Sequence, residues 1–317
     1  MRQALVDPYL VSIWPGMGKV ALSAGSHLVE TLGAERILDI PIDDFFEIEK
    51  VEVQDGIACR GWLPKCTLYG WKNPGSGRDL LISIAEAQPN RQGYELCRHV
   101  LSLCRQYGVS RVYTFAAMAS QIHPTGTPRV VGVTNEATLF DDLNEQGVEI
   151  LQAGQISGLN GVLLAAASEL GMGASCLLGE IPFYAVSVPN PKASMAVLEI
   201  FSRIAGFDIA LGALRRQARS LETRLVELLD RMNIDTPDAE TVDLFDENAV
   251  EELTLGDFMM DPPIEEPVTD EDSNRIESLF RAAEEDRRKA VELKDELDRL
   301  GAFRDYEDRF LDLFRRR

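Results

Sequence analysis

Apolar positions in residues 1–210 follow two periods. Short apolar runs, typical of buried strands, alternate with longer segments in which apolar residues recur every three or four positions, as on one face of a helix. The expected strands are residues 10–13, 34–40, 51–62, 65–71, 79–85, 111–115, 129–133 and 174–178. The expected helices are residues 20–32, 91–107 and 191–205, one over about 136–145 and one that begins at 158–161. Because strands that alternate with helices form sheets covered on both faces, the pattern predicts an α/β domain with a mostly parallel sheet.

One pair of strands is expected to form a hairpin. The runs 51–62 and 65–71 are separated only by Leu63 and Pro64, so we expect the chain to turn there. The cluster of Asn, Pro, Gly and Ser at 73–77 then ends the second run before the next buried strand begins.

The last third of the chain has a different pattern. Apolar residues recur at alternating spacings of four and three, which predicts a coiled-coil helix over residues 211–232: Leu214, Ala218, Leu221, Leu225, Leu228 and Met232. Residues 273–317 contain a second amphipathic segment marked by Ile276, Leu279, Ala283, Ala290, Leu293, Leu297 and Leu300. Two such helices can cover each other's apolar faces, so we expect a C-terminal antiparallel helical hairpin.

An acidic segment, residues 233–272, separates these two helices. From Asp230 to Asp272 there are sixteen acidic residues and one basic residue, Arg231. So few apolar residues do not offset the entropy of ordering the chain, and we expect a disordered linker. Its apolar island, Leu253–Met260, is either a short docking motif or an apolar patch of a solvated linker that adheres to the domain.

Composition narrows the class of protein. The 317 residues are 45% hydrophobic, enough for a hydrophobic core that needs no disulfide or metal cross-links, and the five cysteines show no CxxC spacing. We therefore expect reduced thiols and a cytoplasmic protein, with neither a signal peptide nor a membrane span. The formal charge of −20 argues against binding of nucleic acid, because a phosphate backbone would be repelled.

The loop Gly16-Met17-Gly18-Lys19 lies between the first strand and the first helix, where backbone N–H groups and the helix dipole favour an anion. A phosphate-binding P-loop would require GxxxxGK[ST], and a dinucleotide fingerprint would require glycine where Ala21 stands. This loop is therefore either a ligand-binding loop or a tight turn that needs glycine.

Polar residues near the carboxyl ends of predicted strands form a second candidate site. Glu86, His123 and Glu180 are expected at one edge of the sheet, where a carboxylate and imidazole cluster could do general acid–base work. The alternative is that these side chains cap helices and fix loops. No GxSxG motif and no metal-ligand spacing is present, so neither a serine nucleophile nor a metal is predicted.

Four segments in a fixed order carry a family resemblance: Trp14-Pro15-Gly16-Met17-Gly18-Lys19-Val20, the strand and loop 79–89, Ile156-Ser157-Gly158-Leu159-Asn160-Gly161, and Leu177-Leu178-Gly179-Glu180-Ile181-Pro182. Together they resemble the proteasome assembly chaperone 2 family, whose bacterial and archaeal members are sometimes labelled ATP-grasp-like. The resemblance covers about residues 4–210. Residues 85–88 read Ala-Glu-Ala-Gln where the family usually has Gly-Glu-Pro-Gln.

The resemblance implies a three-layer αβα sandwich similar to the phosphorylase and hydrolase folds. It also implies a non-enzymatic, assembly-chaperone-like protein that binds protein partners without cofactors and forms homo-oligomers, trimers or tetramers. Archaeal homologues dock on proteasomes through a C-terminal hydrophobic–tyrosine–any-residue tail, which the final residues Phe314-Arg315-Arg316-Arg317 lack. The alternative is a phosphorylase- or hydrolase-like enzyme that binds a phosphate or nucleoside-type ligand at Gly16–Lys19.

Overall fold

Two units make up the chain, Met1–Phe245 and Asp246–Arg317. The computed structural model describes residues 5–47, 51–54, 56–232 and 270–285, together with Lys289, Leu293 and Tyr306. The predicted acidic linker and its island Leu253–Met260 lie almost entirely outside the described residues.

The first unit is built on an eight-stranded sheet in the order β2-β5-β6-β1-β7-β10-β8-β9. The strands are β1 (Tyr9–Ile13), β2 (Glu35–Ile40), β5 (Cys66–Trp71), β6 (Leu80–Ala85), β7 (Arg111–Ser120), β8 (Val130–Thr134), β9 (Glu149–Ile150) and β10 (Gly173–Pro182). The central strands β6, β1, β7 and β10 are parallel, whereas β5 and β8 run antiparallel to their neighbours in this set. The predicted mostly parallel sheet is therefore confirmed.

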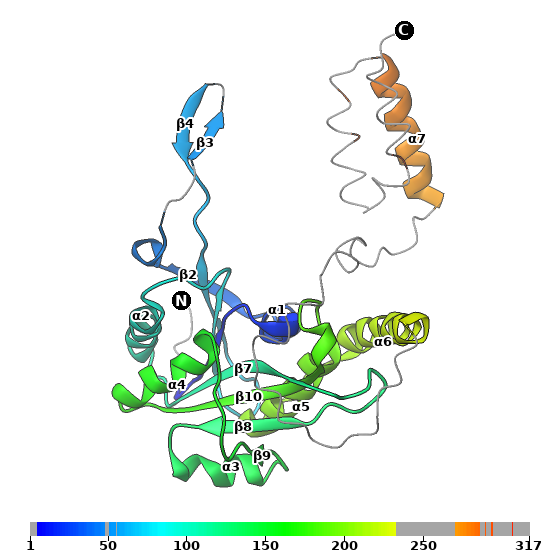
Figure 1. Ribbon diagram of the computed structural model, residues 1–317. Coiled ribbons are helices and arrows are strands. Elements are labelled where there is room, and N and C mark those ends of the chain that lie inside the picture. The colour runs from blue at the N-terminus through cyan, green and yellow to red at the C-terminus, as the bar shows by residue number, and fades with distance from the viewer. Residues whose placement is uncertain are drawn as a thin grey trace. The chain divides into compact units, whose positions relative to one another are not determined.

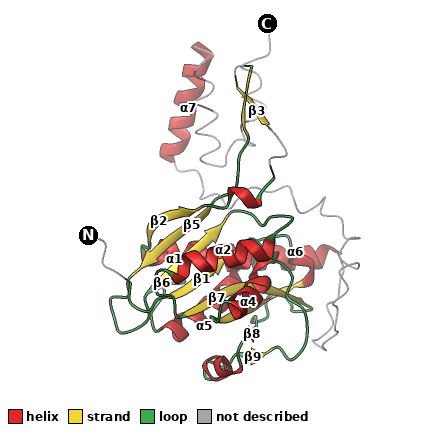
Figure 2. Cartoon of the chain, turned by 90° about the vertical axis from the view of Figure 1, so that its left-hand side faces the viewer, coloured by secondary structure: helices red, strands yellow, loops and turns green. Residues whose placement is uncertain are grey.

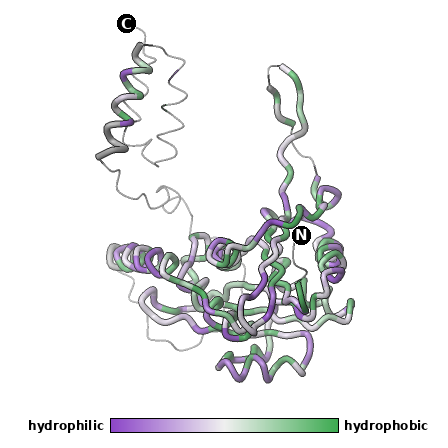
Figure 3. The backbone as a smooth tube through the Cα atoms, turned by 180° about the vertical axis from the view of Figure 1, so that it is seen from behind, coloured by the Kyte–Doolittle hydropathy of each residue, from purple (hydrophilic) through white to green (hydrophobic). Residues whose placement is uncertain are grey.

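Helices cover both faces of the sheet (Figures 1 and 2). Alternation along β1 shows the cause: Val11 and Ile13 pack with helices α1 (Val20–Leu32) and α5 (Pro191–Ala205). Leu10 and Trp14 pack on the other face with α2 (Gly93–Arg105) and α4 (Leu159–Glu169). A short helix, α3 (Phe140–Asn144), packs near β9. This arrangement confirms the three-layer αβα sandwich, and Figure 3 shows the hydrophobic positions gathered along its strands.

The predicted turn at Leu63 and Pro64 is wrong. The hairpin consists instead of β3 (Val51–Gln54) and β4 (Ile57–Arg60), while β5 pairs with β2 and β6 in the main sheet. Gln54 pairs with Ile57, so the chain reverses between them, and Gly56 has a positive φ of 78°. The sequence between the two strands is Asp-Gly, which favours two-residue hairpin turns. The β3–β4 hairpin extends away from the sheet (Figure 1).

The first predicted C-terminal helix is present as α6 (Gly212–Met232), and α7 (Asp270–Glu285) forms the beginning of the second predicted segment, most of whose later residues lie outside the described ones. In the first unit, α6 buries Leu214, Ala218 and Leu225 on the α/β domain beside α5. In the second unit, Phe280 of α7 is fully buried and its ring centroid lies 5.8 Å from that of Tyr306. The pairing of the two predicted segments with each other stays a prediction.

Candidate functional site at the carboxyl edge of the sheet

The parallel strands β6, β1, β7 and β10 all end at one edge, which we call the carboxyl edge. Three of the four motif segments directly follow or end these strands: the loop after β1, the loop after β6, and the end of β10. The fourth begins helix α4. Because ligands bind at this edge in open α/β sheets, it is the candidate site.

Asn160 in the first turn of α4 holds the end of β1. Its side-chain oxygen accepts hydrogen bonds from the Trp14 N–H (3.2 Å) and the Thr114 hydroxyl (2.9 Å), and its amide group donates to the Trp14 carbonyl (3.2 Å). All three residues are buried. Asn160 thus bridges α4, β1 and β7, and its polar atoms are used inside the protein.

Gln88 plays a similar part in the loop after β6. Its side-chain oxygen accepts from the Leu159 N–H at 2.9 Å, and its amide group donates to the Pro15 carbonyl. Since Leu159 begins α4, its N–H has no partner within the helix, and Gln88 satisfies it. Gly158 has a positive φ of 74°, and a Cβ at this position would lie 3.2 Å from the Gln88 amide. Glycine at 158 therefore permits this close contact.

The Gly16–Lys19 loop forms a tight turn. Gly18 and Lys19 both have positive φ angles, 59° and 45°. The Gly18 N–H donates to the Val186 carbonyl at 2.6 Å, and the Lys19 N–H donates to the Gly16 carbonyl at 3.1 Å. Two of the N–H groups on which anion binding would depend are thus already occupied. The Lys19 and Met17 side chains are exposed.

Glu180 is held in an ion pair within β10, two residues before the strand ends and opposite Met118 of β7. Its carboxylate accepts from the Arg129 N–H (3.1 Å), Nε (3.3 Å) and guanidinium NH₂ (3.0 Å). Burial raises the pKa of Glu180, but the hydrogen bonds from Arg129 outweigh burial and the pKa lies below its ordinary value. A general acid near neutral pH requires the opposite shift, so the geometry favours a structural ion pair.

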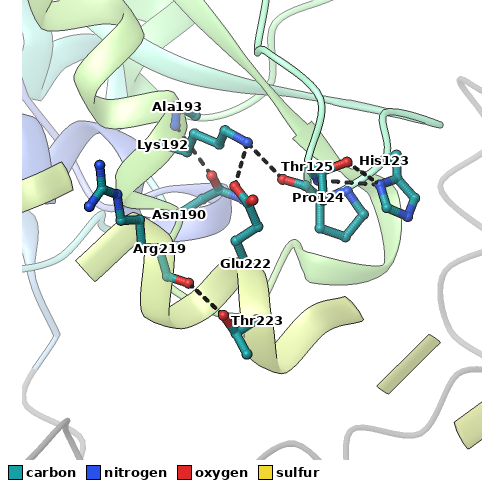
Figure 4. A network of polar contacts seen from close by, with 9 residues as sticks. All are labelled: His123, Pro124, Thr125, Asn190, Lys192, Ala193, Arg219, Glu222 and Thr223. Atoms are coloured by element: carbon teal, nitrogen blue, oxygen red, sulfur yellow. Dashed lines mark hydrogen bonds and ion pairs between the residues drawn. The ribbon is translucent and has the colours of Figure 1, made fainter. Parts of the chain in front are cut away.

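His123 lies in the loop after β7, next to a polar network that attaches α6 to the domain (Figure 4). The Lys192 ammonium donates to the Glu222 carboxylate of α6 at 2.7 Å and to the Pro124 carbonyl at 2.9 Å. His123 Nδ1 accepts from the Thr125 N–H at 3.3 Å. The network therefore joins three segments: the loop after β7, the start of α5, and α6.

The predicted acid–base cluster is only partly assembled. His123 and Glu180 line the same cavity, whose volume of about 20 Å³ has room for about one water molecule. Glu86 accepts instead from the Lys65 N–H at 2.9 Å, at the end of β6. Two strands separate β6 from β10, which places Glu86 about 14 Å across the sheet from Glu180. The three residues do not form one site.

Sequence reasoning missed the partners that define this edge. Asn160 stands beside a motif glycine, and Gln88 follows a predicted strand at the edge where ligands bind, but nothing in their spacing showed that both would reach the loop after β1. Arg129 and Lys192 gave no signal, because an isolated basic residue in a loop or first helical turn is common. The contacts form only when segments 30 to 146 residues apart meet, as the pairs Lys192–Glu222 and Trp14–Asn160 illustrate.

The fold and this edge define a three-layer α/β sandwich whose motif side chains form hydrogen bonds with other parts of the same chain. The chain belongs to the PAC2 family, whose model matches residues 10–229, and the expected family is thereby confirmed. A curated relative, the uncharacterized protein MJ1210 of Methanocaldococcus jannaschii, is 26% identical over 226 residues, which cover 69% of this chain and 82% of the relative.

Solved structures agree with the family. Pyrococcus furiosus PbaB, described as an archaeal proteasome activator, is 26% identical with a TM-score of 0.61, over 72% of this chain and 96% of PbaB. The Mycobacterium tuberculosis proteasome-assembly chaperone homologue Rv2125 is 22% identical with a TM-score of 0.58, over 69% of this chain and 94% of that chain. At 22% identity, the similarity to Rv2125 shows a shared fold and nothing more. Among the described residues, no helix has both the length and the apolar character needed to cross a bilayer.

Proposed function

We propose that this protein is a non-enzymatic, assembly-chaperone-like protein that binds other proteins. The observation that carries the proposal is the use of the motif side chains at the carboxyl edge. Asn160, Gln88 and Glu180 each direct their polar atoms to other parts of the same chain. An edge that is filled in this way is suited to present a fixed surface and poorly suited to enclose a substrate.

The surface at this edge carries exposed apolar side chains. Met17 is 44% exposed and Phe183 is 39% exposed, and a hydrogen bond between Gly18 and Val186 joins the two loops that hold them. Exposed methionine and aromatic residues are favoured at protein interfaces. The similarity to PbaB, described as a proteasome activator, supports a subunit of a large protein assembly as the class of partner. We include self-association in the proposal.

A protein partner is tested by affinity purification of the tagged full-length chain from its host. The double variant Met17→Ser, Phe183→Ser removes the apolar surface at the carboxyl edge. Phe140→Ser is the matched control, because Phe140 is 37% exposed on α3. We expect the double variant to lose proteins that the wild type and the control recover. Equal recovery by all three chains would contradict the proposal.

The enzyme alternative is tested by thermal unfolding with inorganic phosphate, adenosine or ATP, at constant ionic strength. It requires an anion at Gly16–Lys19, so Lys19→Ala should abolish any stabilisation by such a ligand. Lys72→Ala is the control, since Lys72 is also exposed. We expect no ligand to raise the melting temperature. A saturable rise that only Lys19→Ala removes would favour the alternative and count against the proposal.

A further inference from the structure

The first half of α6 carries a concentration of positive charge. Residues 212–221 contain no acidic residue and three basic ones, Arg215, Arg216 and Arg219, although the chain as a whole has 52 acidic and 32 basic residues. All three arginines are exposed, whereas Leu214 and Ala218 of the same turns are buried. We call the three arginine side chains the arginine face.

The arginine face has no counter-charge among the described residues, where no acidic side chain forms an ion pair with it. Glu222 lies one helical turn after Arg219, a spacing at which the two could pair, but its carboxylate bonds to the Lys192 ammonium at 2.7 Å. Figure 4 shows the Arg219 guanidinium directed away from that ion pair. The charge of the arginine face is therefore uncompensated within the described part of the chain.

This arrangement is unfavourable for the helix that carries it. α6 begins at Gly212 and has no acidic residue in its first turn. Positive side chains near the start of a helix are repelled by the partial positive charge of that end. Arg215 and Arg219 are also four positions apart, where like charges on one helix face repel each other. The arginine face weakens α6 in isolation, which indicates that its use lies in binding and not in the fold.

We propose that the arginine face binds an acidic segment of a protein partner. This inference rests on the proposed function and adds the chemistry of the partner's contact surface. A guanidinium group can bond a carboxylate through two parallel hydrogen bonds, and arginine is enriched at protein interfaces. The three arginines span about 6 Å along the helix axis, which matches carboxylates carried by a few neighbouring residues of a partner.

The charge of the whole chain favours an acidic protein segment over nucleic acid. Nucleic acid carries a phosphate at every nucleotide, so its binding would bring further negative charges against a chain of formal charge −20. α6 also has no aromatic residue on which a base could stack. A short acidic segment can place its carboxylates on the arginine face and leave the acidic remainder of the surface out of contact.

The proposal is tested by fluorescence anisotropy of a labelled poly-glutamate peptide added to the full-length chain. We expect binding that weakens as salt is added, because exposed charges are screened. Replacement of all three arginines by glutamine, which forms helices about as well, should reduce the affinity roughly tenfold, since three exposed ion pairs are lost. A poly-thymidine oligonucleotide of equal charge should bind more weakly than the peptide.

The matched control replaces three other exposed arginines by glutamine: Arg36, Arg91 and Arg105. These arginines already bond to other parts of the domain, and their replacement changes the net charge by the same amount. The control should keep the wild-type affinity for the peptide. The arginine-face variant should melt no lower than the wild type, because the change removes repulsion within α6. A lower melting temperature would give the face a structural role and overturn the proposal, as would equal affinity of both variants or tighter binding of the oligonucleotide.

A further variant separates a partner's acidic residues from the chain's own, which follow α6 in residues 233–272. In this variant the acidic residues of that range are replaced by their amides. Peptide binding by this variant and not by the wild type would identify the chain's own acidic residues as the competing group and overturn the proposal. The recovery experiment with Met17→Ser, Phe183→Ser does not involve the arginine face, so failure of peptide binding beside intact partner recovery leaves the proposed function standing.

Discussion

Replacement of Asn160 by alanine tests whether the carboxyl edge is structural. The change removes three hydrogen bonds, two to the backbone of Trp14 and one to the Thr114 hydroxyl, and all the groups involved are buried. Alanine cannot replace any of these bonds, and the β1 end lies too deep for bulk water to reach it.

The expected cost follows from the groups left without partners. A buried polar group that loses its partner costs about 1–3 kcal/mol, and three neighbouring groups do not add fully, so we expect a loss of about 3–5 kcal/mol in the free energy of unfolding. For a domain of this size such a loss lowers the melting temperature by about 10 °C. The loss is large because both the N–H and the carbonyl of Trp14 depend on one side chain.

The assay is urea unfolding followed by circular dichroism, with Gln152→Ala as control. Gln152 also donates to a backbone carbonyl, that of Ile150, but is exposed, so its loss should change the free energy by less than about 0.5 kcal/mol. If Asn160→Ala costs no more than this control, Asn160 does not hold the edge together. Such a stable variant that also lost partner or ligand binding would place Asn160 in a functional site.

Three further predictions concern charge, packing and thiol reactivity. The pKa of Glu180 is lowered in the folded protein, so its carboxylate stabilises the fold at pH values above the ordinary pKa of 4.5, and this stability is lost as the pH falls through the folded-state pKa. Urea unfolding should therefore show that Glu180→Gln destabilises the protein at pH 7 and has a smaller effect in acid below the folded-state pKa. Gly25→Ala should lower the melting temperature although alanine favours helices, because its Cβ would lie 2.8 Å from a side chain of β1. Gly212→Ala should not, because its Cβ would lie 3.8 Å from the Arg216 side chain, an ordinary contact distance. Burial raises the pKa of Cys176 to about 12, so a thiol reagent at pH 8 should modify the partly exposed Cys59 in the folded protein and Cys176 only after unfolding; rapid reaction of Cys176 would contradict its burial.

The layered fold could be predicted because its strands are fully buried. β1 and β6 are almost unbroken apolar runs, and such runs between amphipathic helices have few alternatives to a central parallel sheet. Strand ends were less well predicted: the pattern ended β7 at Phe115 and β10 at Leu178, but β7 continues to Ser120 and β10 to Pro182. The added residues include polar ones such as Glu180, whose ion pair makes its burial tolerable.

The site could not be predicted to the same degree, since it depends on which strands become neighbours. The sequence placed Glu86, His123 and Glu180 after or near strand ends, but only the strand order separates Glu86 from Glu180 by two strands. The hairpin turn was misplaced because Pro64 looked like a turn residue, although the Asp-Gly dipeptide at residues 55–56 is the stronger turn signal.

By itself, the sequence determined the α/β class, the family and the two C-terminal helices, because period, composition and motif order are local properties of the chain. Only the tertiary structure decided what the motifs do. Whether Asn160 faces a ligand or the backbone of Trp14 depends on residues 146 positions apart meeting at one edge.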